Sequence, residues 1–333
     1  MSLGSSVRPL CELYDLAMLD LDGVIYIGAD PVPGAVDAIA AARRGGMRVA
    51  FLTNNASRTA ADVAQHLRDL DVDANAADVV TAAQAVAHLV SEAVPTGSAV
   101  LVVGGDGLRV PLEERGLRCV TRLDDEPVAI VQGFHPDVGW RALAEAAYAI
   151  DSGLPWFASN TDLTIPTARG VAPGNGSLVQ AVRNATGATP TVAGKPERAL
   201  FDETLDRMSA ERPIMVGDRL DTDIDGAIGA GLDSLAVLSG VTSITDVANL
   251  PAGRRPTFVG GDLSALVSAH PEVAADETSA TCGTAAAALD GDVVRLNQGA
   301  PTSIEAMRAV VTLAWSLRDR SGRDVQVDGT LNA

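Results

Sequence analysis

Residues 16–24 read LAMLDLDGV, a short apolar run that ends in two aspartates, Asp20 and Asp22, followed by Gly23. A short apolar run without polar alternation is typical of a strand buried on both faces, as in a parallel sheet. Side chains alternate along a strand, so both aspartates can face one site only if the chain leaves the strand between them. Gly23 is well suited to such a turn. The stretch therefore predicts a buried parallel strand that ends in two carboxylates.

The same order of a short strand, polar residues and a turn or helix recurs three times. The three sites are Thr53-Asn54-Asn55 after VAFL, Gly194-Lys195-Pro196 after TVA, and Gly217-Asp218 after PIMV. Each has an ordinary structural interpretation when taken alone: a helix cap, a loop or a charged turn. Open parallel sheets bind ligands beyond the carboxyl ends of their strands. The combination therefore predicts that the four strand ends converge on one crevice.

The order of strand and helix patterns predicts an α/β fold, with a Rossmann-like, doubly wound parallel sheet as its core. Residues 16–72 alternate strand and helix, residues 98–150 form a second such series, and residues 212–240 return to the first pattern. This return indicates a domain inserted within another. We expect the core at residues 1–81 and 184–270, and an inserted α/β domain at 82–183.

Residues 271–333 are expected to form a small C-terminal α/β appendage of unknown role. Residues 270–291 are rich in Ala, Thr and Gly with weak periodicity, 292–298 could form a strand, and 303–320 have the spacing of an amphipathic helix. A fragment of a second enzyme is an alternative, but the segment is too short for a whole acetyltransferase domain. We expect the appendage to pack on the core or on a second subunit, and a homo-oligomer would form through the inserted domain or the appendage.

Composition limits the partners. The 333 residues are 47% hydrophobic and 20% charged, which predicts a folded chain, and the net charge of −18 disfavours nucleic acid and anionic membranes. There is no apolar run of membrane-spanning length and no signal-peptide pattern. Three scattered cysteines, Cys11, Cys119 and Cys282, predict free thiols in a reducing cytoplasm. A small anion remains a feasible ligand if a metal, a helix N-terminus or a lysine supplies local positive charge.

The polar residues at these strand ends could perform phosphoryl transfer. Asp20 can attack phosphorus to form an aspartyl phosphate, and Asp22 can protonate the leaving oxygen and then activate water. Asp20 and Asp218 can hold Mg²⁺ through hard oxygen ligands. Thr53 and the amides after it can bond the phosphoryl oxygens.

Lys195 is the only lysine among 25 Lys and Arg residues. Arginine presents a broad planar fork, whereas lysine is a compact point charge. The exception to the chain's use of arginine therefore predicts a confined site, in which Lys195 lies between a carboxylate and a phosphoryl oxygen.

Together the four motifs, with Gly217–Ile224 reading GDRLDTDI, resemble those of haloacid-dehalogenase-superfamily phosphatases. Residues 158–196 resemble subfamily IIA, which carries a large α/β (C2) cap between the second and third motifs. The resemblance implies Asp20 as nucleophile and Asp22 as acid/base, with Thr53, Asn54, Asn55 and Lys195 binding substrate. It further implies Mg²⁺ held by Asp20, the Asp22 backbone carbonyl and Asp218, with Asp223 orienting bound water or Lys195.

The substrate is expected to be a small phosphomonoester. The chain most resembles actinobacterial glycerol 3-phosphate phosphatases, which implies hydrolysis to glycerol and phosphate. Phosphoglycolate, pyridoxal phosphate and nucleotide monophosphates are alternatives within the subfamily. Ile165 stands where the pyridoxal phosphatase branch would carry histidine, which favours a small substrate. An alternative of another class is a catalytically silent, phospho-ligand-binding regulatory module, although binding alone would not require Asp22.

Overall fold

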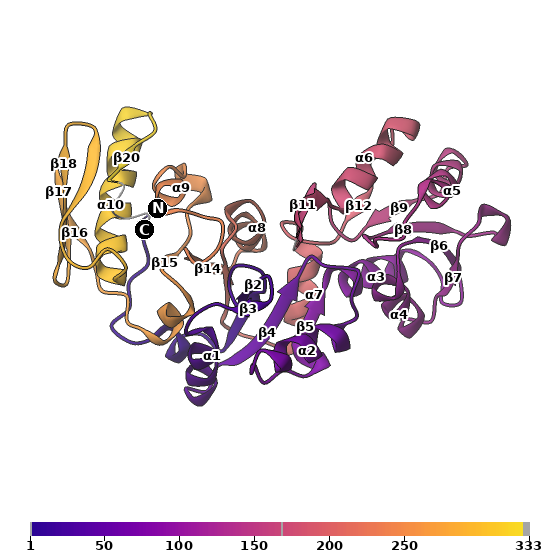
Figure 1. Cartoon of the computed structure of the whole chain (residues 1–333), viewed down its shortest axis with the longest axis horizontal. Coiled ribbons are helices and arrows are strands. Elements are labelled where there is room, and N and C mark those ends of the chain that lie inside the picture. The colour runs from indigo at the N-terminus through magenta and orange to yellow at the C-terminus, as the bar shows by residue number, and fades with distance from the viewer. Residues whose placement is uncertain (1, 168, 329–333) are drawn as a thin grey trace. The chain divides into compact units, whose positions relative to one another are not determined.

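The computed structural model describes residues 2–167 and 169–328, and the chain divides into two compact units. The first unit comprises residues 1–49 and 210–333, and the second comprises residues 50–209. Figure 1 shows the course of the chain through the elements of each. The two units are described separately below.

The first unit contains a run of parallel strands in the order β15-β14-β13-β1. Their bounds are Leu16–Asp20 for β1, Pro213–Gly217 for β13, Asp233–Val237 for β14 and Phe258–Gly260 for β15. Every residue of β1 is buried, as expected for an apolar run covered on both faces. The helices of this part are α1 (Ala35–Arg44), α8 (Asp225–Ala230) and α9 (Ile244–Ala248), and β2 (Tyr26–Ile27) and β3 (Asp30–Pro31) form a small hairpin.

The C-terminal segment forms a five-stranded sheet in the order β16-β17-β18-β19-β20, with α10 packed on it (Figure 1). The bounds are Ala274–Ala275, Ser279–Cys282, Ala285–Asp290, Val293–Gln298 and Gln326–Val327 for the strands and Ile304–Ser321 for α10. The predicted strand at 292–298 and helix at 303–320 are confirmed within one residue. Residues 270–291, where the sequence shows only weak periodicity, contain three strands. Alanine has little β-propensity, so antiparallel pairing and the packing of α10 decide this structure instead.

The C-terminal segment shares one hydrophobic core with the parallel sheet of the first unit. Val247 and Val259 belong to the same buried cluster as Val310 and Trp315 of α10. The indole Nε1 of Trp315 donates to the Val247 carbonyl at 2.8 Å, and Arg255 pairs with Asp319 at 2.6 Å. The appendage therefore packs on the core, which is one of the two arrangements expected from the sequence.

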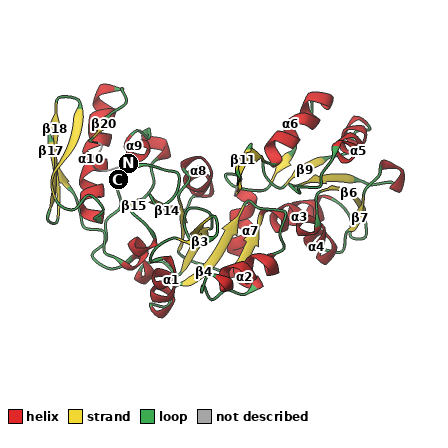
Figure 2. Ribbon diagram, in the orientation of Figure 1, coloured by secondary structure: helices red, strands yellow, loops and turns green. Residues whose placement is uncertain are grey.

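The second unit contains β4 and β5, which pair in parallel, and a five-stranded parallel sheet in the order β12-β9-β8-β6-β7. Figure 2 shows α5 and α6 on one side of that sheet and α3 and α4 on the other. The strands are β4 (Arg48–Thr53), β5 (Val79–Thr81), β6 (Ala99–Val103), β7 (Arg118–Val120), β8 (Ala129–Gln132), β9 (Trp156–Ala158), β12 (Thr191–Val192), and the hairpin β10 (Thr164–Thr167) and β11 (Gly170–Pro173). The helices are α2 (Ala60–Asp69), α3 (Ala82–Ala93), α4 (Asp106–Glu114), α5 (Trp140–Asp151), α6 (Asn175–Thr186) and α7 (Arg198–Met208).

Two observations on the second unit concern β12 and the start of α2. Thr191 and Val192 pair with β9, so β12 belongs to the five-stranded sheet. Helix α2 begins at Ala60, because Thr59 and Asp62 form a capping box there. The domain limits at 82 and 183 stay predictions.

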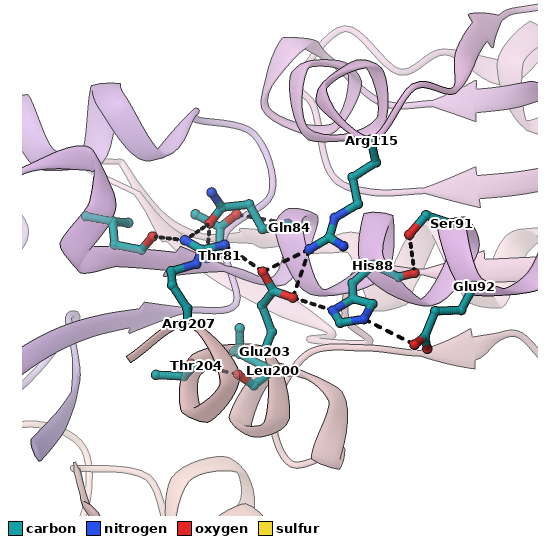
Figure 3. A network of polar contacts seen from close by, with 11 residues as sticks. Thr81, Gln84, His88, Ser91, Glu92, Arg115, Leu200, Glu203, Thr204 and Arg207 are labelled. Atoms are coloured by element: carbon teal, nitrogen blue, oxygen red, sulfur yellow. Dashed lines mark hydrogen bonds and ion pairs between the residues drawn. The ribbon is translucent and has the colours of Figure 1, made fainter. Parts of the chain in front are cut away.

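A polar network joins α3, the end of α4 and α7 (Figure 3). The buried carboxylate of Glu203 accepts from Arg207 at 2.6 Å and Arg115 at 3.0 Å, and lies 2.5 Å from Nδ1 of His88. Nε2 of His88 faces Glu92 at 3.3 Å. Burial alone would raise the pKa of Glu203, but the hydrogen bonds from His88 and Arg207 outweigh burial and lower that pKa.

Two predictions from composition can be compared with the structure. Cys11, Cys119 and Cys282 all carry free thiols, as expected. Across residues 2–167 and 169–328, none of the helices combines the length and the apolar character that crossing a membrane requires.

Candidate active site

Three buried carboxylates gather at the strand ends of the first unit. Asp20 is the last residue of β1, Asp218 follows β13, and Asp223 lies in the helical turn Leu220–Ile224. One carboxylate oxygen from each lies within 4.8 Å of those of the other two. β1 and β13 are parallel neighbours in register, with Leu19 opposite Val216, so their carboxyl ends meet at the same edge. The structure therefore brings Asp20, Asp218 and Asp223 together.

Glycines leave the space that these carboxylates occupy. Gly23 has φ +82°, and a Cβ built on it would overlap the Asp218 carboxylate, with its carbon only 2.6 Å away. A Cβ on Gly240 would meet the same carboxylate, and one on Gly217 would meet Asp223. Hydrogen bonds fix the rest: the Val241 amide donates to Asp218 Oδ2 at 2.8 Å. The turn that the sequence predicted at Gly23 is confirmed. The missing side chain of Gly23 also leaves room for the Asp218 carboxylate.

The carboxylate cluster fits a hard divalent cation. Three buried carboxylates of like charge repel one another and lose solvation, and a cation between them relieves both costs. Carboxylate oxygens are the ligands that Mg²⁺ and Ca²⁺ prefer. Asp22 is exposed, and its side chain is not part of the cluster. The adjacent turn is closed by the Gly23 amide, which donates to the Tyr26 carbonyl at 2.8 Å.

A second group of predicted residues lies in the second unit, after β4. Thr53 is buried, and its hydroxyl oxygen accepts from the Asn55 amide at 3.1 Å. Asn55 is exposed, and its side-chain oxygen accepts from the amide and the hydroxyl of Ser57. These contacts shape the turn after the strand. The direct binding of substrate by Thr53 and Asn55 stays a prediction.

Lys195 belongs to the same group. It is only 4% exposed, and the side chain of Asn54 binds both ends of its backbone. The Lys195 amide donates to Asn54 Oδ1 at 2.8 Å, and Asn54 Nδ2 donates to the Lys195 carbonyl at 3.0 Å. A Cβ on Gly194 would lie 2.6 Å from the Ser159 carbonyl oxygen and 2.7 Å from Asn54 Oδ1, so only glycine fits there. The structure thus brings Asn54 and Lys195 together, although 141 residues separate them.

For one further part of this group the sequence left open a turn and a substrate role. Asp162 accepts from Asn54 Nδ2 at 3.2 Å, and Asn160 donates to the Asn54 carbonyl at 2.6 Å. Both residues lie in the chain that returns from β9, where polar residues are equally typical of turns. Ile165, which the sequence suggested as an indicator of substrate size, lies in β10 opposite Ala172. The convergence of all four strand ends on one crevice stays a prediction, because the groups belong to separate units.

Family models match two segments of the chain. The model for haloacid dehalogenase-like hydrolases matches residues 17–118, and a second model of HAD-hydrolase-like proteins matches residues 192–266. These two segments contain all four motifs, from Asp20 to Asp223.

Curated relatives and solved structures agree with the family models. The chain is 42% identical over 320 residues to D-glycerol 3-phosphate phosphatase of Mycobacterium tuberculosis, covering 94% of this chain and 89% of the relative. It is 35% identical to an acid sugar phosphatase of Staphylococcus aureus, covering 76% and 97%. A crystal structure of a glycerol phosphate phosphatase of Mycobacterium tuberculosis with magnesium has a TM-score of 0.84 at 40% identity, covering 96% and 94%. The 4-nitrophenylphosphatase of Thermotoga maritima has a TM-score of 0.72 at 28% identity, covering 78% and 98%.

Proposed function

This chain belongs to the haloacid dehalogenase-like hydrolase family, and we propose that it is a Mg²⁺-dependent phosphatase that hydrolyses glycerol 3-phosphate to glycerol and phosphate. The observation that carries the proposal is the buried cluster of Asp20, Asp218 and Asp223 at the ends of parallel strands. The substrate is supported by the 42% identity to a D-glycerol 3-phosphate phosphatase over most of both chains.

The proposed reaction has two steps. A carboxylate oxygen of Asp20 attacks phosphorus, the bond from phosphorus to the glycerol oxygen breaks, and Asp22 gives its proton to that oxygen. Asp22 then takes a proton from water as the water oxygen attacks the aspartyl phosphate, which releases phosphate and restores the Asp20 carboxylate. Asp22 is exposed in the described structure, so it is accessible to water.

The remaining site residues balance charge. Mg²⁺ bound by Asp20, the Asp22 carbonyl and Asp218 would offset the repulsion between a phosphate dianion and the Asp20 carboxylate. Mg²⁺ binding is supported by the carboxylate cluster and by the similar crystal structure of the Mycobacterium tuberculosis phosphatase, which contains magnesium. We assign Thr53, Asn55 and the amides after β4 to the phosphoryl oxygens, and Lys195 to Asp20 and the phosphoryl group. We assign Asp223, which accepts from the Arg219 amide at 3.1 Å, to orienting Mg²⁺-bound water or Lys195.

We also propose a cytoplasmic location, which the three free thiols favour. Association of two copies through the inserted domain or the appendage stays part of the proposal, and size-exclusion chromatography with light scattering would test it.

Initial rates with Mg²⁺ test the proposed function. Glycerol 3-phosphate should have a higher kcat/KM than phosphoglycolate, pyridoxal phosphate and nucleoside monophosphates. The variant Asp20→Asn should lose turnover completely while its circular dichroism and Tm stay close to those of the parent. A faster rate on another ester would replace the substrate, whereas no phosphate release from any ester would favour the silent binding module.

A further inference from the structure

The side-chain amide of Asn54 lies at the meeting point of three segments of the second unit. These are the turn after β4, the loop of residues 193–197 that contains Lys195, and the cap-return segment, which we define as residues 158–163. Asn54 Oδ1 accepts from the Lys195 amide at 2.8 Å. Asn54 Nδ2 donates to the Lys195 carbonyl at 3.0 Å and to both carboxylate oxygens of Asp162, at 3.2 and 3.3 Å.

These neighbours determine which way the Asn54 amide points. Oδ1 faces a backbone donor, whereas Nδ2 faces only acceptors. A flipped amide would place its oxygen against the Asp162 carboxylate and the Lys195 carbonyl, and would leave the Lys195 amide facing an NH₂ group. An amide nitrogen has two hydrogens, and both are directed at these acceptors. The contacts therefore favour a positioning role for the Asn54 side chain over direct contact with a phosphoryl group.

The cap-return segment is itself held in place. The Asp162 amide donates to Asn160 Oδ1 at 3.1 Å, and Asn160 Nδ2 donates to the Asn54 carbonyl at 2.6 Å. Asn175 fixes Asn160 in turn, by donating to its carbonyl at 2.7 Å. Asn160 and Asn175 are both buried, so their hydrogen bonds do not compete with bulk water. Asp162 is thus presented to Asn54 by a connected set of hydrogen bonds.

We propose that Asp162 is a positioning residue for Lys195 and acts through the Asn54 amide. A carboxylate is the strongest acceptor available to an amide N–H, and this bond anchors the Asn54 side chain in one orientation. Asn54 then fixes both the amide and the carbonyl of Lys195. A lysine side chain has four rotatable bonds, so the position of its backbone determines where a buried ammonium group can reach. The catalytic consequence rests on the proposed function, whereas the positioning of the Lys195 backbone does not.

Hydrogen exchange tests the positioning directly, without substrate. The amide of Lys195 should exchange at least about tenfold faster in Asp162→Ala than in the parent, because its acceptor Asn54 Oδ1 is no longer held. Asp162→Asn should stay close to the parent, since an asparagine oxygen can still accept from Asn54. Asp151→Ala is the matched control, because Asp151 is an exposed carboxylate at the end of α5 in the same unit. Unchanged exchange at Lys195 in Asp162→Ala would overturn the proposal.

Kinetics then test the consequence for turnover. Asp162→Ala should lower kcat about 10- to 100-fold and change KM less than about threefold, with Asp162→Asn restoring most of kcat. In a Lys195→Ala background, Asp162→Ala should add less than about a twofold loss, since both changes remove the same interaction. Equal losses in both backgrounds, or a raised KM with kcat intact, would show that Asp162 acts on substrate instead. If the parent hydrolyses no ester, the proposed function fails, and hydrogen exchange alone decides the positioning.

Discussion

Replacing Gly23 by alanine is expected to damage the metal site more than the fold. Gly23 has φ +82°, a conformation that costs an L-residue about 1–2 kcal/mol. The added Cβ would also lie 2.6 Å from the carboxyl carbon of Asp218, whereas ordinary van der Waals contact begins at 3.4 Å. The Asp218 carboxylate must therefore retreat by at least about 0.8 Å, because its Oδ2 lies closer still to the added Cβ. The substitution thus combines a backbone cost with a displacement.

Gly34 separates these two effects. Its φ is +80°, almost that of Gly23, but a Cβ on Gly34 would meet nothing within 4 Å. Gly34→Ala should therefore lower the free energy of unfolding by about 1–2 kcal/mol and leave kcat/KM unchanged. Gly23→Ala should show a similar or larger loss of stability, and kcat/KM should fall about 10- to 100-fold. The Mg²⁺ concentration for half-maximal activity should rise, because Mg²⁺ demands near-ideal octahedral geometry.

The assay is initial rates against Mg²⁺ concentration, together with urea unfolding, for the parent and both variants. The urea unfolding measurements test whether the two alanines impose comparable backbone strain. If Gly23→Ala and Gly34→Ala have the same kcat/KM and the same Mg²⁺ requirement, the displacement of Asp218 has no consequence. The assignment of Asp218 to the metal would then be refuted.

Three further substitutions test other features. Lys195→Arg should lose most of the activity, because the residue is only 4% exposed and a guanidinium is broader than an ammonium; retained activity would contradict the size argument. Glu203→Gln should lower the free energy of unfolding at pH 7 by about 2–3 kcal/mol. Asp202→Asn on the same helix, whose side chain is 45% exposed, should lower it by at most about 0.5 kcal/mol. Because the pKa of Glu203 is lowered on folding, the difference in unfolding free energy between the parent and Glu203→Gln should shrink as pH falls below 4.5. Urea titrations measure it, and a difference that stays constant with pH would contradict the prediction. Burial lowers the pKa of His270 from 6.5 to about 4, so between these pH values the unfolded chain binds more protons and the fold loses stability as pH falls. Relative to His270→Gln, the parent should lose about 2 kcal/mol of unfolding free energy between pH 7 and pH 5. The same dependence of unfolding free energy on pH in both proteins would refute this.

Two carboxylates of the buried cluster, Asp20 and Asp218, were predictable because each stands at the end of a short apolar strand. Asp20 and Asp218 follow LAML and PIMV, two runs that form neighbouring parallel strands, so their convergence follows from the topology. The C-terminal strands were harder to predict. Each of the four residues of β17 pairs with an alanine of β18, and alanine favours a strand only when neighbouring strands and α10 supply the packing.

The sequence alone also singled out Lys195, since a lone lysine among arginines indicates a site where size and charge matter. Tertiary structure decided what holds it. Asn54 and Asp162 lie far from Lys195 along the chain. The sequence around each is equally typical of an ordinary turn, so it does not indicate the hydrogen bonds that join Asn54 to Lys195 and to Asp162. Sequence patterns report local periodicity and strand ends, whereas hydrogen bonds between distant loops depend on how the strands place those loops. The lysine could therefore be found by reading the chain, but its anchoring appears only when the chain is folded.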